Sequence, residues 1–311
     1  MSSAWDGLRN DRELTELPHY AINHSSPADT FFTDREVAEH CFNSLMRVAD
    51  KHGIDTKEYF FLEPSAGEGC FYDLLPRYRR MGLDIEPRGK GIKSADFLEW
   101  YPTQEKKYLV IGNPPFGHRG AYALAFINRA FLFADVVAFI LPMSFYSNGK
   151  GTNMKRVKNA RLIHSEVLKE NAFYTPGIKS PVSVKTVFQV WKKGKGRSVF
   201  ADYDVSDYVD IYTCCSAPSR YCGLGRGRKY DCFIASTFYG NKSVGIVNRF
   251  EDVNYGSGYG IIIKQKKREV RKVLREADWN KYASDATNHC KHLRMNSIRQ
   301  CLGKAGFGRR I

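Results

Sequence analysis

Apolar and polar residues alternate in blocks of two kinds along most of the chain. From about residue 31 to 191, short apolar runs of strand length are separated by stretches with apolar residues at helical spacing. This alternation predicts an α/β fold, a Rossmann-like doubly wound and mostly parallel sheet with helices on both faces. The predicted strands are 59–63, 80–84, 108–112, 136–141, 161–167 and 186–192, and the clearest predicted helices are 35–52 and 120–133.

The pattern changes after residue 192. A basic segment broken by glycines, KKGKGR at 192–197, is followed by short aromatic runs and further glycines. We therefore predict a boundary near residue 195. The predicted parts are an N-terminal extension over 1–30, an α/β catalytic domain over 31–194 and a smaller, basic C-terminal recognition region over 195–311.

Charge is distributed unevenly over these parts. The whole chain carries a formal net charge of +15. Residues 1–191 have about 24 Lys and Arg against about 22 Asp and Glu, whereas residues 192–311 have about 24 against about 11. This asymmetry predicts a polyanionic partner that is contacted mainly through the C-terminal region. The candidate backbone contacts there are Arg226, Arg228, Lys229, Lys264, Lys266, Lys267, Arg268 and Arg271, with a solvated helix face as the less favoured interpretation of the run 264–275.

Composition excludes several other classes of protein. Hydrophobic residues make up 43% of the chain and aromatic residues 14%, which is typical of a globular protein and not of a disordered one. The N-terminus has no apolar signal core, and the most apolar run, 136–142, is too short to cross a bilayer. We therefore expect a cytoplasmic protein with no membrane partner. The cysteine spacing lacks a C-x-x-C pair, so no metal site is expected.

Candidate binding residues follow four successive predicted strands or loops. The turn 63–69, EPSAGEG, has the small residues that let a backbone approach a ligand at a helix N-terminus. Asp84 ends the second strand, and Asp96 and Phe97 come before the next element. Asn113, Pro114, Pro115 and Phe116 follow the strand 108–112. Open α/β sheets bind ligands at the carboxyl ends of their strands, so these segments predict a single site.

The NPPF turn has a specific physical meaning. Two prolines end the strand, because each lacks a donor for the sheet and fixes its own φ. Asn113 is thereby held at the strand end on a stiff turn, beside the ring of Phe116. A neutral amide and an aromatic ring in this position suit the capture of a planar group that carries an amine.

These motifs together resemble the S-adenosylmethionine-dependent adenine-N6 DNA methyltransferases, with the γ-like order of motifs and the NPPF type of catalytic turn. The resemblance covers about residues 31–191, which implies the class I methyltransferase sheet. It implies cofactor-binding roles for Phe32, Thr33, Glu63, Ala66, Gly67, Gly69, Asp84, Asp96 and Phe97. It implies catalytic roles for Asn113, Pro114, Pro115 and Phe116, and stacking on the target base by Phe116, Phe173 and Tyr174.

The implied reaction is transfer of a methyl group from S-adenosylmethionine to the N6 amino group of an adenine flipped out of double-stranded DNA, by direct displacement. The same chemistry on RNA adenine and N5 methylation of a protein glutamine remain alternatives, as does a binding module without activity. Because no room is left for a nuclease domain, the resemblance implies either the partner of a separate cognate restriction endonuclease or an orphan enzyme, in the cytoplasm of a bacterial or virus-infected cell.

Overall fold

The computed structural model describes residues 32–147, 151–169, 172–174, 184–196, 198–216, 228–239, 244–253, 256–287 and 290–311. These residues form two compact units, one running up to Val199 and the other spanning Phe200–Ile311. The predicted boundary at residue 195 lies a few residues before Phe200. The predicted extension over 1–30 lies outside the described residues.

The first unit is built on a seven-stranded sheet with the order β4-β3-β2-β5-β6-β9-β7. Its strands are β2 (Tyr59–Glu63), β3 (Arg80–Asp84), β4 (Lys93–Ser94), β5 (Lys107–Gly112), β6 (Ala134–Pro142), β7 (Ala160–Val167) and β9 (Thr186–Lys193). Only β9 runs against its neighbours, pairing antiparallel with β6 and β7. The predicted Rossmann-like fold of the class I methyltransferase type is therefore confirmed for this unit.

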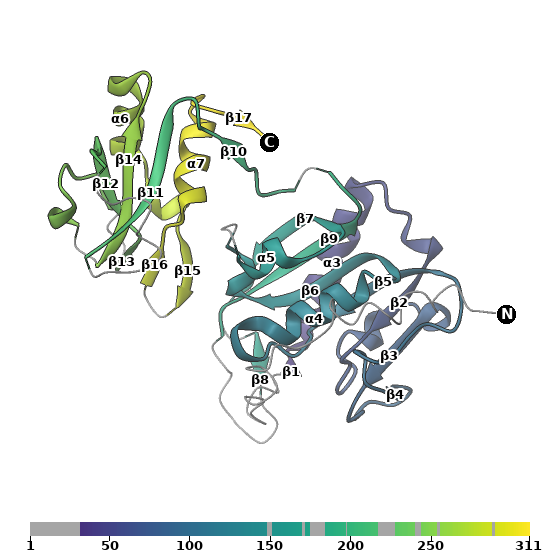
Figure 1. Cartoon of the computed structure of the whole chain (residues 1–311). Helices are drawn as coiled ribbons and strands as arrows, with labels where there is room; N and C mark the ends of the chain where they lie inside the picture. Colours follow the sequence, from purple (N-terminus) through teal and green to yellow (C-terminus); the bar gives the residue numbers. More distant parts are fainter. Residues whose placement is uncertain are drawn as a thin grey trace. The chain divides into compact units, whose positions relative to one another are not determined.

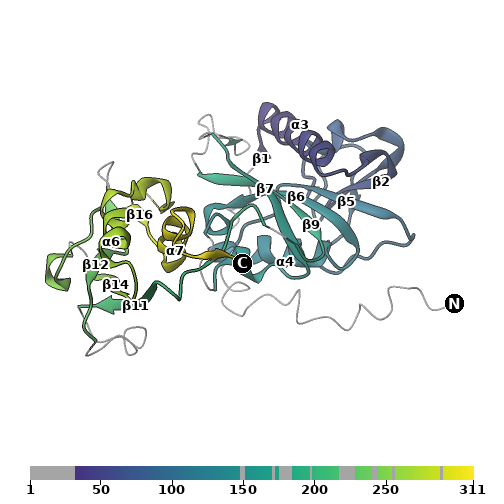
Figure 2. The same cartoon turned by 90° about the horizontal axis from the view of Figure 1, so that it is seen from above.

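Helices cover both faces of this sheet (Figure 2). Helix α3 (Arg35–Lys51) packs Ala38, Cys41 and Leu45 into the core, and α4 (Ala121–Ala130) lies on the opposite face. Asp34 caps α3 by accepting a hydrogen bond from the backbone N–H of Glu36 at 2.9 Å. A short helix, α5 (Asn153–Arg156), follows β6. Two-residue strands β1 (Phe32–Thr33) and β8 (Phe173–Tyr174) pair antiparallel outside the main sheet.

The strand order creates a binding position at one edge. β2 lies between β3 and β5, so the chain leaves β2 toward one side of the sheet and later returns on its other side. Strands β2, β3 and β5 are mutually parallel, and their carboxyl ends lie at the same edge. Loops after β2 and β5 diverge at such a reversal and leave a crevice for a ligand.

Within its described residues, the second unit contains three small antiparallel sheets and two α-helices, whose strands and helices are labelled in Figure 1. The sheets are β11 (Val209–Cys215), β14 (Ser257–Ile263) and β12 (Cys232–Ala235); β13 (Thr237–Tyr239), β16 (Cys290–His292) and β15 (Ser284–Thr287); and the pair β10 (Tyr203–Asp204) and β17 (Arg309–Arg310). Helices α6 (Lys267–Glu276) and α7 (Met295–Lys304) bury Val270, Leu274, Ile298 and Leu302 in a core with Trp279.

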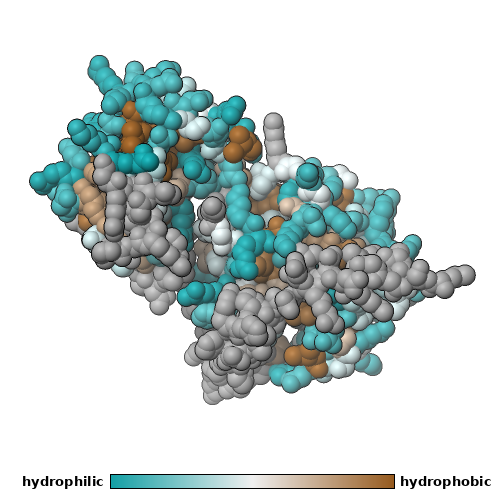
Figure 3. Space-filling model, in the orientation of Figure 1, coloured by the Kyte–Doolittle hydropathy of each residue, from teal (hydrophilic) through white to brown (hydrophobic). Residues whose placement is uncertain are grey.

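Short 3₁₀ turns link the elements in both units: Thr56–Glu58, Tyr72–Leu74, Arg77–Arg79, His118–Gly120, Met143–Phe145, Phe250–Asp252 and Trp279–Lys281. Among the described residues no helix combines the length and apolar character that a membrane span needs. Polar residues dominate the visible described surface of both units, with apolar residues in scattered groups (Figure 3).

Candidate active site

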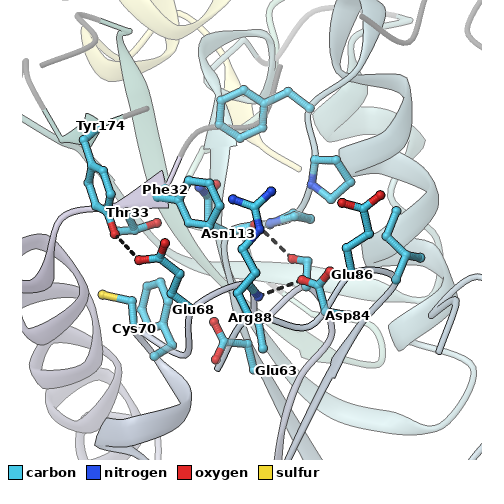
Figure 4. A pocket seen from close by; sticks show the side chains of 18 residues that line it. Phe32, Thr33, Glu63, Glu68, Cys70, Asp84, Glu86, Arg88, Asn113 and Tyr174 are labelled. Carbon is cyan, nitrogen blue, oxygen red and sulfur yellow. Dashed lines mark hydrogen bonds between the residues drawn. The ribbon is translucent and has the colours of Figure 1, made fainter. Parts of the chain in front are cut away.

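A pocket of about 440 Å³ opens at the carboxyl edge of the main sheet (Figure 4). Its walls come from the loops after β2, β3 and β5 and from the β1–β8 pair. A volume of this size is typical of small-molecule sites. The lining residues are Phe32, Thr33, Glu63, Ser65, Ala66, Gly67, Glu68, Cys70, Phe71, Asp84, Ile85, Glu86, Arg88, Asn113, Pro114, Pro115, Phe116 and Tyr174.

The glycine turn after β2 forms the floor of this pocket. The N–H of Ala66 donates to the carbonyl of Leu83 at 2.9 Å, and the N–H of Gly67 donates to Asp84 Oδ2 at 2.7 Å. Gly67 has φ +49°, and a Cβ there would lie 3.1 Å from the Phe32 ring. A side chain at Gly67 would therefore be strained and would press on the pocket wall. Gly69 also has a positive φ, +94°, but does not line the pocket.

Glu63 places a carboxylate at the base of the pocket. Glu63 is 2% exposed, and its Oε2 atom is buried without a hydrogen-bond partner among the described residues. Burial, followed by the nearby charges of Asp84 and Asp73, raises the pKa of Glu63 well above its usual value, although backbone N–H groups of Tyr72 and Phe71 oppose the shift. An acceptor buried in this way is costly unless a ligand donates to it.

Asp84 presents a second carboxylate, held in a fixed orientation by two backbone donors. Its Oδ2 accepts from Gly67 and its Oδ1 accepts from the N–H of Glu86 at 2.8 Å. The two residues after Asp84 also face the pocket, and Ile85 is 71% exposed although it is apolar. An exposed isoleucine at a pocket rim offers an apolar surface to a flat ligand group.

The NPPF turn lies opposite this floor. Asn113 and Phe116 are half-buried, Pro114 is buried and Pro115 is exposed. The Ser65 hydroxyl donates to the backbone carbonyl of Asn113 at 2.9 Å, which joins the glycine turn to the NPPF turn. The carbonyl of Phe116 accepts from the N–H of Tyr122 at 3.2 Å, which ties the turn to the start of α4.

The β1–β8 pair closes one side of the pocket. Its register places Phe32 opposite Tyr174, with ring centroids 5.7 Å apart. The Tyr174 hydroxyl donates to Glu68 Oε2 at 2.9 Å, as Figure 4 shows. Burial and this carboxylate raise the pKa of Tyr174 to about 12, so the hydroxyl keeps its proton at physiological pH. The Arg88 guanidinium lies 5.0 Å from the centroid of the Phe32 ring.

Some predicted residues are not brought to the pocket. Asp96 and Phe97 do not line it. Phe97 is 1% exposed and packs against Phe126 and Phe133, with centroids 5.1 and 6.2 Å away. Phe173 is also 1% exposed and meets the ring of Phe116 edge-on at 6.4 Å, so its ring supports Phe116 from within the core.

Other lining residues were not assigned to the site from the sequence: Ser65, Glu68, Cys70, Phe71, Ile85, Glu86 and Arg88. All of them lie within four positions of a predicted site residue, so proximity to the strand ends was the available signal. Nothing in the local sequence distinguishes the side chains in these turns that point inward.

The predicted basic residues of the second unit are exposed to different degrees and often paired. Lys264 and Lys267 lie 3.1 Å from Asp210 and Asp231, respectively. The guanidinium of Arg271 donates to the carbonyl of Asp231 and to Asn248. Lys266 has φ +47° at the N-terminal cap of α6, and Arg228, Lys229 and Arg268 are exposed. Arg226 lies outside the described residues.

Among the described residues, no group of His, Cys, Asp and Glu is arranged to hold a metal ion. The pocket therefore presents carboxylates, an amide, aromatic rings and backbone N–H groups as its chemical resources.

Comparison with known proteins finds likeness only in structure. No family model matches the sequence, and no curated protein matches it significantly. A Thermoplasma acidophilum protein aligns at 19% identity over 61% of this chain and 99% of its own, with a TM-score of 0.38. A candidate RNA methyltransferase of Pyrococcus horikoshii aligns at 16% over 63% and 100%, with a TM-score of 0.39. The M protein of the type I restriction enzyme EcoKI aligns at 15% over 80% and 65%, with a TM-score of 0.34. Identities and TM-scores this low carry no conclusion about function.

Proposed function

We propose that this chain transfers a methyl group from S-adenosylmethionine to the N6 amino group of adenine in DNA. The observation that carries the proposal is a single pocket lined by a buried carboxylate, Glu63, and by an NPPF turn, Asn113 to Phe116. The buried carboxylate suits a cationic ligand with several donors, and the NPPF turn suits a planar base with an amino group.

The pocket residues fit the proposed cofactor. Four carboxylates, of Glu63, Glu68, Asp84 and Glu86, line the cavity against one guanidinium, that of Arg88. S-adenosylmethionine carries an ammonium, a sulfonium and two ribose hydroxyls, and a cavity with an excess of carboxylates suits these positive charges and donors. The buried Oε2 of Glu63 would accept from one of these donors. When bound, the cofactor supplies the electrophilic methyl group.

The NPPF turn would prepare the amino group. The adenine N6 lone pair is delocalised into the ring, so the nitrogen is a poor nucleophile. The side-chain oxygen of Asn113 and the carbonyl of Pro114 would each accept one N6 hydrogen and draw the nitrogen toward tetrahedral geometry. Because the prolines and the bond from Ser65 hold the turn rigid, these acceptors are oriented before the base arrives.

A duplex base must leave its stack to reach such a pocket, at a cost of a few kcal/mol. Stacking on an aromatic ring returns about 1–3 kcal/mol per base. We assign this contact to Phe116, whose ring lines the pocket and is supported edge-on by Phe173. Tyr174 bonds to Glu68 and packs on Phe32, so we place it on the cofactor side of the pocket. The basic residues of the second unit would contact phosphates.

Methyl transfer from labelled cofactor tests the proposal. Purified protein would be incubated with duplex DNA of mixed sequence, single-stranded DNA, ribosomal RNA and a glutamine-containing peptide. We expect N6-methyladenine in the DNA, identified by mass spectrometry of the nucleosides, and none with the Asn113→Ala variant. Label found only in RNA or only in the peptide would show that the substrate is RNA or protein and not DNA. Absence of label from every acceptor would refute the proposed activity.

A further inference from the structure

One sheet of the second unit carries a row of aromatic rings on the face away from its core. In the sheet β11-β14-β12, Ile234 and Ile261 point into the core of the unit and are 0% exposed. Side chains alternate along each strand, so Phe233 and Tyr212 lie on the opposite face. Both are half-buried. With Tyr230 and Phe250, which are also half-buried, they form what we call the aromatic row.

The rings of the row contact one another in order. Ring centroids are 6.3 Å apart for Tyr212 and Tyr230, 5.1 Å for Tyr230 and Phe233, and 5.8 Å for Phe233 and Phe250. Angles of 63°, 59° and 58° between successive ring planes show that the rings meet at a steep tilt. The four rings therefore form one continuous, partly exposed aromatic surface.

A glycine makes the row continuous. Gly260 on β14 pairs with Tyr212 of β11 on one side and with Phe233 of β12 on the other. A Cβ at Gly260 would lie 2.6 Å from the ring of Tyr230, so Tyr230 occupies the space that a side chain would fill. Any larger residue at this position would displace the ring.

Cations lie at both ends of the row. The Arg228 guanidinium lies 4.3 Å from the centroid of the Tyr212 ring, and Lys229 beside it is exposed. At the other end, Arg249 precedes Phe250 and pairs with Asp252 at 2.9 Å. Asp210, on the same face as Tyr212, is paired with Lys264. Rings that only covered the sheet would not require flanking cations. A nucleic-acid strand would use the rings to stack its bases and the cations to bind its phosphates.

We propose that the aromatic row is a stacking platform for unpaired bases of a nucleic-acid strand, with its phosphates held by Arg228, Lys229 and Arg249. Every base has a π-face, so tilted aromatic rings beside cations bind single strands with little dependence on sequence. This surface requires neither the pocket nor the cofactor. It therefore goes beyond the proposed transfer reaction, which needs only one flipped adenine.

Binding of short oligonucleotides without cofactor tests the platform. Fluorescence anisotropy would compare a thymidine strand of about 12 nucleotides, an abasic strand of the same length and charge, and the corresponding uridine strand. We expect the base-containing strands to bind roughly 5- to 150-fold more tightly than the abasic strand for each base that stacks. Tighter binding of the uridine strand would identify RNA as the source, and equal binding would show that the sugar is not read. Equal affinity for the base-containing and abasic strands would overturn the proposal.

Two variants and a control separate stacking from folding. Tyr212→Leu keeps an apolar side chain but removes the ring, and Gly260→Ala displaces the Tyr230 ring without deleting any aromatic residue. Both should lose affinity for base-containing strands and keep their affinity for the abasic strand. Tyr239→Leu, at a tyrosine that is 64% exposed on a different sheet of the same unit, should bind like the wild type. If both row variants bind base-containing strands normally, the row is only a structural cover.

The oligonucleotide-binding test of the aromatic row and the methyl-transfer test of the proposed function can give negative results independently of each other. Loss of methyl transfer to every acceptor would leave oligonucleotide binding intact, and an inactive row would leave methyl transfer to DNA intact. The Asn113→Ala variant, expected to be inactive in transfer, should bind single strands as the wild type does.

Discussion

Replacing Glu63 with glutamine should make the protein more stable and bind S-adenosylmethionine more weakly. Glutamine keeps the shape of the side chain and can still accept the backbone bonds from Phe71 and Tyr72, but it removes an ionisable group from a residue that is 2% exposed to solvent. A residue whose role is only structural would lose stability on such a change. Opposite effects on stability and binding are expected of a buried charge reserved for a ligand.

The pH dependence of this effect has a definite sign. Burial raises the pKa of Glu63, so the native protein holds this proton more tightly than the unfolded chain does. The corresponding stability is fully present below the unfolded pKa and is lost as the pH rises through the native pKa. The free energy of unfolding of the Glu63→Gln variant should therefore be close to that of the wild type at low pH, and should exceed it by an increasing amount as the pH rises.

The size of both effects follows from the buried Oε2 atom. Leaving a buried polar group unsatisfied costs about 1–3 kcal/mol, and more for a charge. Glutamine needs neither to bind a proton nor to bury a charge on folding, so we expect a gain of about 1–3 kcal/mol at neutral pH. For a unit of this size that gain raises Tm by roughly 2–12 °C. Loss of a bond from the cofactor to a charged acceptor, worth about 1.5–3 kcal/mol, should weaken binding roughly 10- to 150-fold.

Scanning calorimetry would measure the Tm of the unfolding transition that moves when the cofactor is added. Isothermal titration calorimetry would measure the affinity for S-adenosylmethionine. Asp73→Asn is a matched control, because Asp73 is an exposed carboxylate that acts on Glu63 through its charge but does not line the pocket. That variant should change cofactor affinity by about twofold at most, as expected of an exposed charge. A Glu63→Gln protein that is less stable at neutral pH, or that binds the cofactor normally, would refute the reasoning.

Three further predictions concern other residues. Asn113→Ala should abolish methyl transfer but change cofactor affinity only a few-fold in titration, since we assign its amide to the target base and not to the cofactor; a large loss of cofactor binding would contradict this assignment. DNA affinity measured by anisotropy should fall steeply with salt, and more shallowly when Arg268 and Arg275 of α6 are changed to alanine; an unchanged salt slope would exclude this helix face as a phosphate contact. Glu166 has a pKa lowered to about 2, chiefly by His164 and Ser44 acting against the effect of burial. Its contribution to stability is therefore present above the unfolded pKa and lost as the pH falls toward 2, so Glu166→Gln should cost about 1–3 kcal/mol at pH 6 and little at pH 2, measured by urea unfolding.

The sheet and its binding edge were predictable because they depend on local signals. Apolar runs bounded by turns mark buried strands, and the carboxyl ends of parallel strands meet at one edge whatever the details of packing. Glu63, Asp84 and Asn113 each lie at or just beyond a strand end, so the rule places them together. Pro114 and Pro115 mark the end of β5 on their own.

The positions of aromatic rings were less predictable. Phe97 follows Asp96 just as Ile85 follows Asp84, yet Phe97 is buried and Ile85 is 71% exposed. The difference comes from α4 and the residues after it, which supply Phe126 and Phe133 around Phe97. Such contacts depend on segments about 30 residues apart, and no local pattern encodes them.

The strands of the second unit escaped the sequence analysis for a related reason. β14 contains Gly258 and Gly260, which lower the apparent strand propensity of the segment 257–263. In the sheet both glycines lie on the face opposite the core, where a Cβ at Gly258 would meet the carbonyl of Ile234 at 2.5 Å. Neighbouring groups approach β14 so closely that Gly258 and Gly260 are required there, and these same glycines made the segment resemble a loop in the sequence.

The two halves of the pocket are connected in a way that bears on how transfer would be organised. The bond from the Ser65 hydroxyl to the carbonyl of Asn113 links the glycine turn to the NPPF turn. The bond from the Gly67 N–H to Asp84 extends the same frame to the end of β3. Attack on a methyl group needs its donor and acceptor aligned within a fraction of an ångström. Because three strand ends are joined by hydrogen bonds within the chain, this alignment would be set by the fold and would not have to be created when the substrates bind.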